Sequence, residues 1–216
     1  MNKPLYGIYG AGGCGRGILP LARILLNKAN ISPGQLVFID DTLNVDHKNG
    51  QSVISYSNFI ELEASQRYIA LAISNSNIRE ELANKIKNDG FDLWSIQADS
   101  VVVMDDVVIS EGALLSPFVC LTSNIKIGSC FHANLYSYVE HDCVIGNYVT
   151  FAPGVKCNCN VVIEDHAYIG AGAVIKQGTP ENPLIIGERA VIGMGAVVTK
   201  NVSAGDTVIG NPAKPM

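Results

Sequence analysis

The sequence lacks an uninterrupted apolar segment of about 18 residues, the length that a membrane-crossing helix needs. Its first ten residues, MNKPLYGIYG, also lack the apolar core and small-residue cleavage site of a secretory signal. We therefore expect a cytoplasmic protein that does not insert into a membrane. Since 48% of its 216 residues are hydrophobic, the chain has enough apolar side chains for ordinary globular cores.

Positive charge and paired cysteines are scarce as well. The chain has 15 Lys and Arg against 20 Asp and Glu, a net charge of -5, and no block of basic residues. A nucleic-acid partner is therefore not expected. Six cysteines are present, but the close pair Cys157 and Cys159 has neither CxxC spacing nor a second pair beside it. We expect reduced thiols that pack in the core, and no metal site.

Residues 1–99 alternate between apolar strands and amphipathic segments, which predicts a small α/β domain with a parallel sheet. The expected strands are Leu5–Tyr9, Leu36–Ile39 and Tyr68–Ile73. A helix is expected in ILPLARILLNK after the first strand, and another from about Ile78 to Asn88, ending before Gly90.

From about Val101 the apolar residues recur every six positions, and residues 100–216 form the second expected domain. The series is apolar throughout: Val103, Ile109, Leu115, Leu121, Ile127, Ala133, Val139, Ile145, Phe151, Cys157, Ile163, Ile169 and Ile175. Such a repeat predicts a parallel β-helix with three hexads per turn, so that residues 18 apart stack. The register shifts in KQGTPENPLI, where TPENP is expected to form an external loop. In GNPAKPM, two prolines are expected to stay out of the strand ladder.

The glycine cluster G-A-G-G-C-G at residues 10–15 lies between a strand and a helix. Glycines there allow a phosphate to approach the backbone at the helix N-terminus, and Asp40-Asp41 after the next strand suits a ribose hydroxyl. NAD and a nucleotide-linked sugar both satisfy this pattern, and the small size of the domain favours the sugar. The alternative is that these glycines only form a tight turn.

Several segments resemble known enzymes. IGAGAVI, IGMGAVVTKNV and GNPAKPM resemble the hexapeptide-repeat acyltransferases. YGAGGCGR, FIDD, AISNSNIRE and VEHDCVIGNYVTFAPGVKCNCNVVI resemble a narrower family, the bacterial sugar acyltransferases of the sialic-acid, bacillosamine and viosamine pathways. The viosamine-type N-acetyltransferases look nearest. The resemblance covers essentially the whole chain.

The resemblance implies a left-handed β-helix, a homotrimer and acetyl-CoA as co-substrate. It implies N-acetylation of the 4-amino group of a dTDP- or UDP-linked 4-amino-4,6-dideoxy sugar, for lipopolysaccharide or another surface glycan. It also implies the residues that bind the nucleotide sugar: Gly12, Gly13, Cys14, Asp40, Asp41, Ser74, Asn75 and Arg79. Family members can carry histidine at the position of Cys14. For Arg79, contact with phosphate and a place on the solvated side of its helix both remain open.

His141, in VEHDCVIG, is the general base that the resemblance implies, facing a partner subunit's nucleotide sugar. A neutral imidazole can accept the proton of an attacking amine near pH 7. By itself, such a histidine is more often a solvated turn residue. Asp142 is the expected helper, with Glu140 as the competing candidate. Asn134 matches a family asparagine near the reacting centre, although a plain turn asparagine fits equally.

Acetyl-CoA is expected to contact backbone groups on the β-helix. By positional match the candidate residues are Thr150, Gly154, Ala171 and Met194. Bacillosamine-type relatives have a cofactor-contacting histidine where this chain has Thr150. Thr150 is also expected to lie outside the core, like Glu140, His141 and Asp142.

Other classes of protein fit less well. A sugar O-acetyltransferase needs the same base and cofactor and is the closest rival. A non-catalytic β-helix scaffold needs neither the histidine cluster nor the glycine-rich domain. A zinc enzyme of the carbonic-anhydrase type needs histidines that stack, whereas His132, His141 and His166 are 9 and 25 residues apart. An NAD-dependent enzyme leaves the β-helix without a role.

Overall fold

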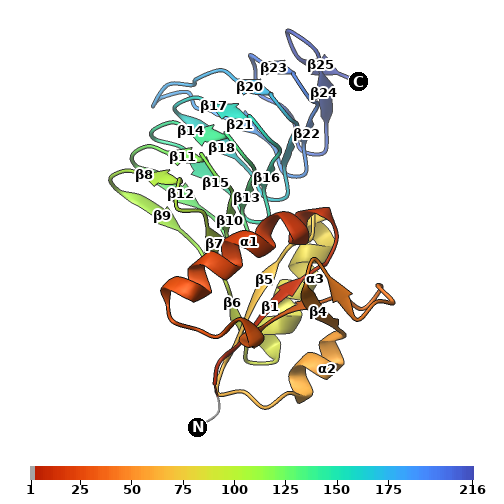
Figure 1. Cartoon of the computed structure of the whole chain (residues 1–216). Coiled ribbons are helices and arrows are strands. Elements are labelled where there is room, and N and C mark those ends of the chain that lie inside the picture. The colour runs from red at the N-terminus through yellow and green to blue at the C-terminus, as the bar shows by residue number, and fades with distance from the viewer. Residues whose placement is uncertain (1–2) are drawn as a thin grey trace. The chain divides into compact units, whose positions relative to one another are not determined.

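The computed structural model describes residues 3–216; Met1 and Asn2, which belong to the first expected domain, lie outside the described residues. The chain forms two compact units, Met1–Ile96 and Gln97–Met216, so the division falls three residues before the end of the expected first domain at 99 (Figure 1). Within residues 3–216, none of the helices has both the length and the apolar character to cross a membrane.

The first unit is built on one six-stranded sheet with the order β3-β4-β2-β1-β5-β6. Its strands are β1 Leu5–Tyr9, β2 Leu36–Ile39, β3 His47–Lys48, β4 Gln51–Ile54, β5 Arg67–Leu71 and β6 Asp92–Leu93. Its helices are α1 Gly13–Lys28, η1 Pro33–Gln35, α2 Tyr56–Glu61 and α3 Ser76–Asn88. The strands β2, β1 and β5 pair in parallel, so their carboxyl ends meet at one edge of the sheet.

The strands β1 and β2 have the bounds that the sequence predicts, and β5 ends two residues earlier, at Leu71 instead of Ile73. The helix α1 begins at Gly13, inside the glycine cluster, although glycine is a poor helix former. The hairpin β3–β4 and the short helix α2 were not predicted. Their sequences are polar or short, and the parallel pairing of β4 with β2 gives them their place.

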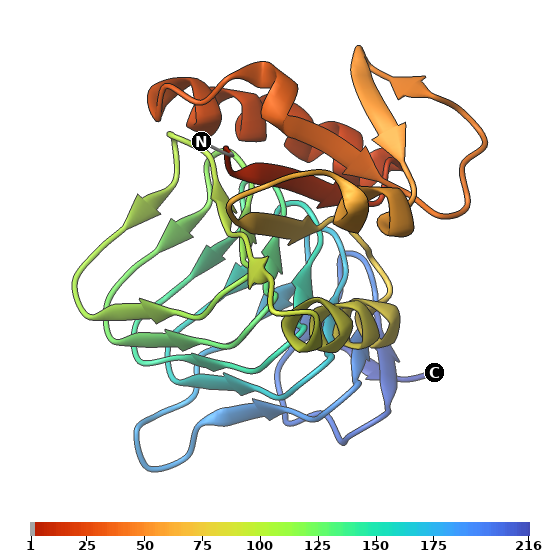
Figure 2. The ribbon, with the colours of Figure 1, turned by 90° about the horizontal axis from the view of Figure 1, so that it is seen from below.

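The second unit is a coil with three sheets that are parallel except for the last strand, β25, as the six-residue period predicts for the coil (Figure 2). The first sheet holds β7 Ile96–Gln97, β10 Leu114–Leu115, β13 His132–Ala133, β16 Thr150–Phe151, β19 Tyr168–Ile169, β22 Val191–Ile192, β24 Thr207–Ile209 and β25 Lys214–Pro215. The second holds β8 Val102–Val103, β11 Cys120–Leu121, β14 Tyr138–Val139, β17 Lys156–Cys157, β20 Val174–Ile175 and β23 Val197–Val198. The third holds β9 Val107–Ile109, β12 Ile125–Ile127, β15 Val144–Ile145, β18 Val161–Ile163 and β21 Leu184–Ile186.

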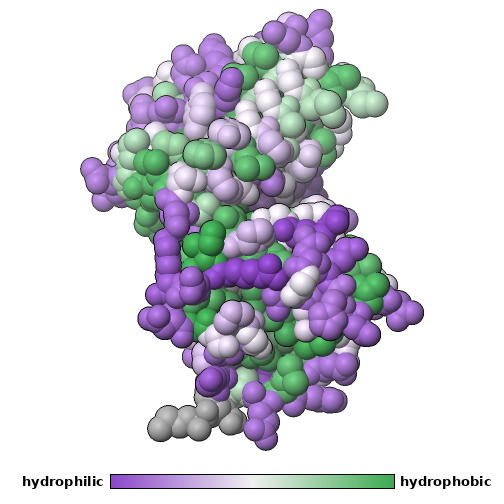
Figure 3. All heavy atoms as spheres, viewed as in Figure 1, coloured by the Kyte–Doolittle hydropathy of each residue, from purple (hydrophilic) through white to green (hydrophobic). Residues whose placement is uncertain are grey.

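Paired residues in successive coils are 18 positions apart, as in the pair Val139 and Cys157. The axial residues from Leu115 to Ile175 are at most 2% exposed and form one continuous core. At the first coil, which ends the stack, Val103 remains 39% exposed. With Val102, Met104 and Val108 it forms an apolar patch over β8 and β9 (Figure 3).

The register shifts where the sequence predicts. Val161 pairs with Leu184, 23 positions later, because the intervening loop is longer than a regular corner. In the loop, Thr179 and Asn182 exchange backbone hydrogen bonds of 3.0 and 3.1 Å. The expectation that both final prolines stay out of the ladder is wrong: Pro215 lies in the antiparallel edge strand β25, opposite Val208. An edge strand tolerates proline because the missing N–H need not pair.

From β8 to β20, each corner of the coil turns through a residue with positive φ. These residues follow the six-residue period without interruption: Asp106, Gly112, Phe118, Asn124, Cys130, Tyr136, Asp142, Tyr148, Gly154, Asn160, His166 and Gly172. Asp and Asn adopt this left-handed conformation more readily than most residues, and glycine most readily of all. The period therefore fixes both the core and the backbone conformation at each corner.

Candidate active site

The glycine cluster occupies the carboxyl end of β1, and its glycines do different work. Gly10 has φ +100° and its carbonyl lies so near α1 that a Cβ on Gly15 would be 1.8 Å from the Gly10 oxygen. Gly12 and Gly13, at the start of α1, have open space where a Cβ would lie. Gly10 thus allows the tight turn, and Gly15 allows α1 to pack closely on β1. Gly12 and Gly13 leave the backbone accessible to a ligand.

Asp40, at the end of β2, organises the loops of the sheet edge. Its Oδ2 accepts a hydrogen bond from the Ala11 amide at 2.9 Å, and its Oδ1 accepts from the Thr42 amide, the Thr42 hydroxyl and the Leu43 amide. Burial acts to raise the pKa of Asp40, but these hydrogen bonds outweigh it and the pKa is lowered. Asp40 is therefore ionised, and the protein's own donors occupy both its oxygens.

Asp41 is exposed and accepts fewer hydrogen bonds. Its Oδ1 accepts from the Tyr56 amide at 2.8 Å, and its Oδ2 accepts from the Tyr9 hydroxyl. Burial and this hydrogen bond raise the pKa of Tyr9, so the phenol stays neutral and donating. Sequence reasoning missed Tyr9, although its place directly before the glycine cluster was visible. Asp41 is the better placed of the two carboxylates to accept from a sugar hydroxyl, because it retains more acceptor capacity.

The end of β5 supplies the third part of this edge. The side chain of Asn75 caps α3 by accepting from the Asn77 and Ile78 amides at 3.0 and 3.1 Å. Arg79 is fully buried, which excludes a place on the solvated side of its helix. Its Nη1 donates to the carbonyl oxygens of Ile73 and Ser74 at 2.8 and 3.3 Å, so it holds this strand end in place.

Cys14 lies in the first turn of α1. Burial raises the pKa of the Cys14 thiol, while the positive charge of Arg79 acts in the opposite direction. The structure therefore brings the predicted residues of the first unit together at the carboxyl ends of β1, β2 and β5. In open parallel sheets, ligands bind at such an edge where the strand order reverses, here between β1 and β5.

His141 and Asp142 lie on the corner between β14 and β15. Nδ1 of His141 is 2.7 Å from Oδ2 of Asp142, and the two side chains are 50% and 46% exposed. Neighbouring residues on an extended strand point to opposite faces, but Asp142 has φ +59°. The left-handed turn brings the carboxylate back onto the imidazole.

The pKa of His141 is raised, first by its hydrogen bond with Asp142 and further by the charges of Asp142 and Glu140, while desolvation acts against them. The pKa of Asp142 is lowered, first by the same hydrogen bond and then by one from Asn124. Among the described side-chain hydrogen bonds, His141 pairs with Asp142 and not with Glu140. The geometry therefore favours Asp142 over Glu140 as the helper.

Asn134 lies on a different corner, after β13, and the structure does not place it beside His141 within one chain. Its Nδ2 donates to the Phe151 carbonyl at 2.7 Å. Asn158, 24 residues later on the corner after β17, makes the same kind of contact with the Ile175 carbonyl at 2.8 Å. This repetition identifies a contact between successive coils.

Three of the cofactor candidates share the corner that follows the first sheet. Gly154, Ala171 and Met194 come after β16, β19 and β22, and Asn134 belongs to the same edge. Met194 is 82% exposed. Within the described part of the chain, the amides of Ala171 and Met194 donate no hydrogen bond, and a Cβ on Gly172 or Gly195 meets open space. This edge presents backbone groups to an extended ligand.

Thr150 lies outside the apolar core, which its neighbours Val149 and Phe151 occupy, but it is not open to solvent, because it is only 7% exposed. It belongs to the flat sheet, not to the corner, and pairs with His132 in one coil and Tyr168 in the next. Strands in a sheet lie about 4.8 Å apart, so the two larger side chains flank and shield it.

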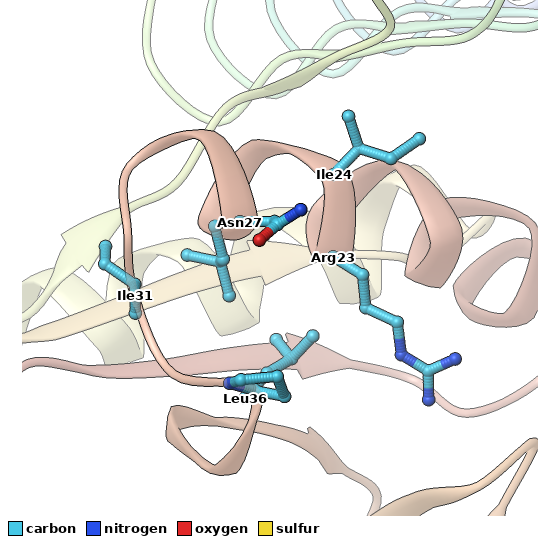
Figure 4. Close-up of a pocket in the computed structure, with 7 residues that line it drawn as sticks. Arg23, Ile24, Asn27, Ile31 and Leu36 are labelled. Atoms are coloured by element: carbon cyan, nitrogen blue, oxygen red, sulfur yellow. The ribbon is translucent and has the colours of Figure 1, made fainter.

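A separate pocket of about 300 Å³ lies in the first unit (Figure 4). It is lined by Arg23, Ile24, Leu26, Asn27, Ile31, Pro33 and Leu36. Leu36 begins β2, so the pocket is at the opposite edge of the sheet from the glycine loop. Between residues 3 and 216, no group of three or more His, Cys, Asp or Glu side chains is arranged to hold a metal ion.

Comparison with known proteins matches both units. The PglD N-terminal domain matches residues 7–86, and the hexapeptide repeat of succinyl-transferase matches residues 160–200. GDP-perosamine N-acetyltransferase of Escherichia coli O157:H7 is 52% identical over 212 residues, which cover 98% of this chain and 96% of that protein.

Two solved structures have the same fold over the full length. WeeI from Acinetobacter baumannii AYE is 55% identical, with a TM-score of 0.96 over 99% of this chain and 100% of that one. The acetyltransferase domain of PglB from Neisseria gonorrhoeae FA1090, in complex with acetyl coenzyme A, is 26% identical, with a TM-score of 0.86 over 100% of both chains.

An α/β unit with a glycine loop, followed by a hexapeptide β-helix, defines the sugar acyltransferases of the hexapeptide-repeat class, and the β-helix is left-handed as the resemblance implies. The chain belongs to the nucleotide-sugar N-acetyltransferase family, together with the GDP-perosamine enzyme. The predicted family and fold are thereby confirmed, and the protein is an enzyme that acetylates a sugar amine.

Proposed function

We propose that this protein transfers an acetyl group from acetyl-CoA to the 4-amino group of a nucleotide-linked 4-amino-4,6-dideoxy sugar, with His141 as general base. The observation that carries the proposal is the half-exposed His141–Asp142 pair with its 2.7 Å contact. Its setting adds support, because the chain is 52% identical to a nucleotide-sugar N-acetyltransferase. The product is destined for lipopolysaccharide or another surface glycan.

The hydrogen bond to Asp142 assigns the imidazole a catalytic tautomer. A carboxylate only accepts hydrogen bonds, so Nδ1 of His141 carries the proton and Nε2 is left as the basic nitrogen. The sugar amine attacks the thioester carbonyl carbon, and Nε2 takes the proton that the nitrogen loses. The carbon–sulfur bond then breaks, the imidazolium returns the proton to the departing thiolate, and the amide and free CoA thiol remain.

The nucleotide sugar binds at the carboxyl ends of β1, β2 and β5 in this proposal. Gly12, Gly13 and Cys14 lie at the N-terminus of α1, where backbone amides and the helix dipole favour a phosphate. Asp41 accepts from the ribose, and Ser74 and Asn75 border the site. Arg79 supports the site indirectly, because it is buried and its guanidinium donates a hydrogen bond to the Ser74 carbonyl.

In this proposal acetyl-CoA lies along the corner edge that carries Gly154, Ala171 and Met194. It contacts the backbone amides of Ala171 and Met194, which donate no hydrogen bond within the described residues. We assign Asn134, on the same edge, to the acyl end of the cofactor, and Thr150 to a supporting role in the neighbouring sheet. Because His141 is on another corner, we propose that the active enzyme is a homotrimer in which one subunit's His141 serves an edge of the next.

The nucleotide is guanosine diphosphate in our proposal, because a relative that is 52% identical over 98% of this chain is a GDP-perosamine enzyme. The resemblance of the sequence motifs points instead to dTDP or UDP. We expect kcat/KM for a GDP-linked amino sugar to exceed that for the dTDP and UDP forms by at least about tenfold, the effect of one well-formed hydrogen bond to the base. Thiol release from acetyl-CoA with the three matched substrates measures this, and equal or reversed preference contradicts it.

Asp142→Asn keeps the shape of the corner but removes the negative charge. We expect the pKa of His141 to fall toward its ordinary value, because the charge that stabilises the imidazolium is gone. The acid limb of the pH–rate profile therefore moves to lower pH, and the plateau falls about three- to tenfold because the base is weaker. The measurement is kcat against pH.

Glu140→Gln is the matched control for that experiment. Glu140 raises the pKa of His141 only through its charge, without a hydrogen bond in the described residues. We expect a smaller displacement of the acid limb than Asp142→Asn gives. A larger displacement identifies Glu140 as the helper and contradicts the assignment to Asp142.

A further inference from the structure

The carboxylate of Asp142 is held from two sides. Its Oδ2 accepts from His141, and its Oδ1 accepts from Nδ2 of Asn124 at 3.2 Å. Asn124 is 18 residues before Asp142, so it occupies the same corner one coil earlier. The Asp142 amide also donates to the Ser123 carbonyl at 3.1 Å, which ties the backbone of the two corners together.

The alignment of the two side chains follows from the backbone at this corner. Asp106, Asn124, Asp142 and Asn160 have φ values of 55°, 57°, 59° and 53° and form one column along the coil. Residues with the same conformation, stacked about 4.8 Å apart, project their side chains in the same direction. A short amide in one coil therefore reaches a short carboxylate in the next.

We infer that Asn124 is a positioning residue for the reaction: it holds the Asp142 carboxylate in the rotamer that meets His141. An amide suits this task because it donates without charge, whereas a second carboxylate would repel Asp142. Both side chains of the pair are about half exposed, so water competes with their contact and the extra anchor matters. The catalytic meaning of this inference rests on the proposed role of His141.

The other titratable groups near His141 do not orient the Asp142 carboxylate. Glu140 and Cys143 share its corner and act on it through charge, and Cys159 holds the equivalent position in the next coil. None of them donates a hydrogen bond to the Asp142 carboxylate in the described part of the chain. Among the described hydrogen bonds, the donors to the Asp142 carboxylate are His141 and Asn124.

Replacing Asn124 by glycine tests the inference, because glycine keeps the left-handed corner without strain and removes the amide. In an NMR titration of the full-length protein, we expect the pKa of the His141 imidazole to fall toward its ordinary value. The His141 signal is identified by its absence from the His141→Ala variant. We also expect kcat to fall about two- to threefold, with the acid limb of the profile at lower pH and KM for acetyl-CoA unchanged.

Asn160→Gly is the matched control, since Asn160 has the same residue type and conformation one coil later, and its side chain makes no hydrogen bond to Asp142 among residues 3–216. We expect its His141 pKa to equal that of the wild type. An unchanged His141 pKa in Asn124→Gly overturns the inference, as does an equal shift in both variants. A shift in Asn124→Gly alone supports it even if His141→Ala retains turnover, in which case the proposed role of His141 fails separately.

Discussion

His141→Ala lowers kcat by about 10²- to 10⁴-fold, the loss expected when a general base is removed from a proton-transfer step. The KM values for acetyl-CoA and the nucleotide sugar stay close to those of the wild type, because the imidazole is assigned to the proton and not to binding. The side chain is half exposed on a corner, so its removal leaves no cavity in the core. Steady-state thiol release and a thermal melt together measure both effects.

His47→Ala is the control for a non-specific effect of losing a histidine. His47 is exposed in β3 of the first unit and interacts with the Ser52 hydroxyl at 3.4 Å. We expect its turnover to match the wild type. Near-normal turnover in His141→Ala would remove His141 from the mechanism, and a comparable loss in His47→Ala would show that the effect is not specific.

Gly15→Ala destabilises the first unit, because the added Cβ would lie 1.8 Å from the Gly10 carbonyl oxygen and 3.2 Å from the Phe38 ring. The start of α1 must move away from β1, which also displaces Gly12 and Gly13. We expect the free energy of unfolding to fall by about 1–3 kcal/mol, the cost of overpacking, and KM for the nucleotide sugar to rise. Chemical denaturation and steady-state kinetics measure the two effects.

Gly17→Ala, in the same helix, is the matched control. An added Cβ at Gly17 meets no heavy atom within 4 Å, and alanine is the better helix former. We expect this variant to gain about 0.5–1 kcal/mol of stability and to keep its KM. If Gly15→Ala is as stable as Gly17→Ala, the close packing of α1 on the β1 loop has no energetic role.

The β-helix was open to prediction because one rule repeats through twelve corners. Each axial position needs an apolar side chain, so the period of six is written directly into the residues from Val103 to Ile175. The ends of the strands in the first unit could also be predicted from the sequence, because glycines and acidic residues follow short apolar runs there. The hairpin β3–β4 carries no such pattern, because its residues take their conformation from the pairing of β4 with β2.

The site was predictable in residue type but not in geometry. The sequence left the contact between His141 and Asp142 dependent on a turn, and the turn exists because Asp142 falls on the positive-φ position of the period. The burial of Arg79, which the sequence left open, and of Thr150 could not be predicted, because packing by residues distant in sequence is invisible in a local pattern. Asn124 could have been found from its spacing of 18 before Asp142.

The linkage formed in the product tests the central claim most directly. We expect the purified enzyme, supplied with acetyl-CoA and a GDP-linked 4-amino-4,6-dideoxy sugar, to release one free thiol for each acetylated nucleotide sugar. The acetyl group should survive mild alkaline hydroxylamine, because an amide resists conditions that cleave an ester. An acetyl group lost under these conditions would identify a sugar O-acetyltransferase, and an absence of acetylated nucleotide sugar with the GDP-, dTDP- and UDP-linked amines would contradict the account altogether.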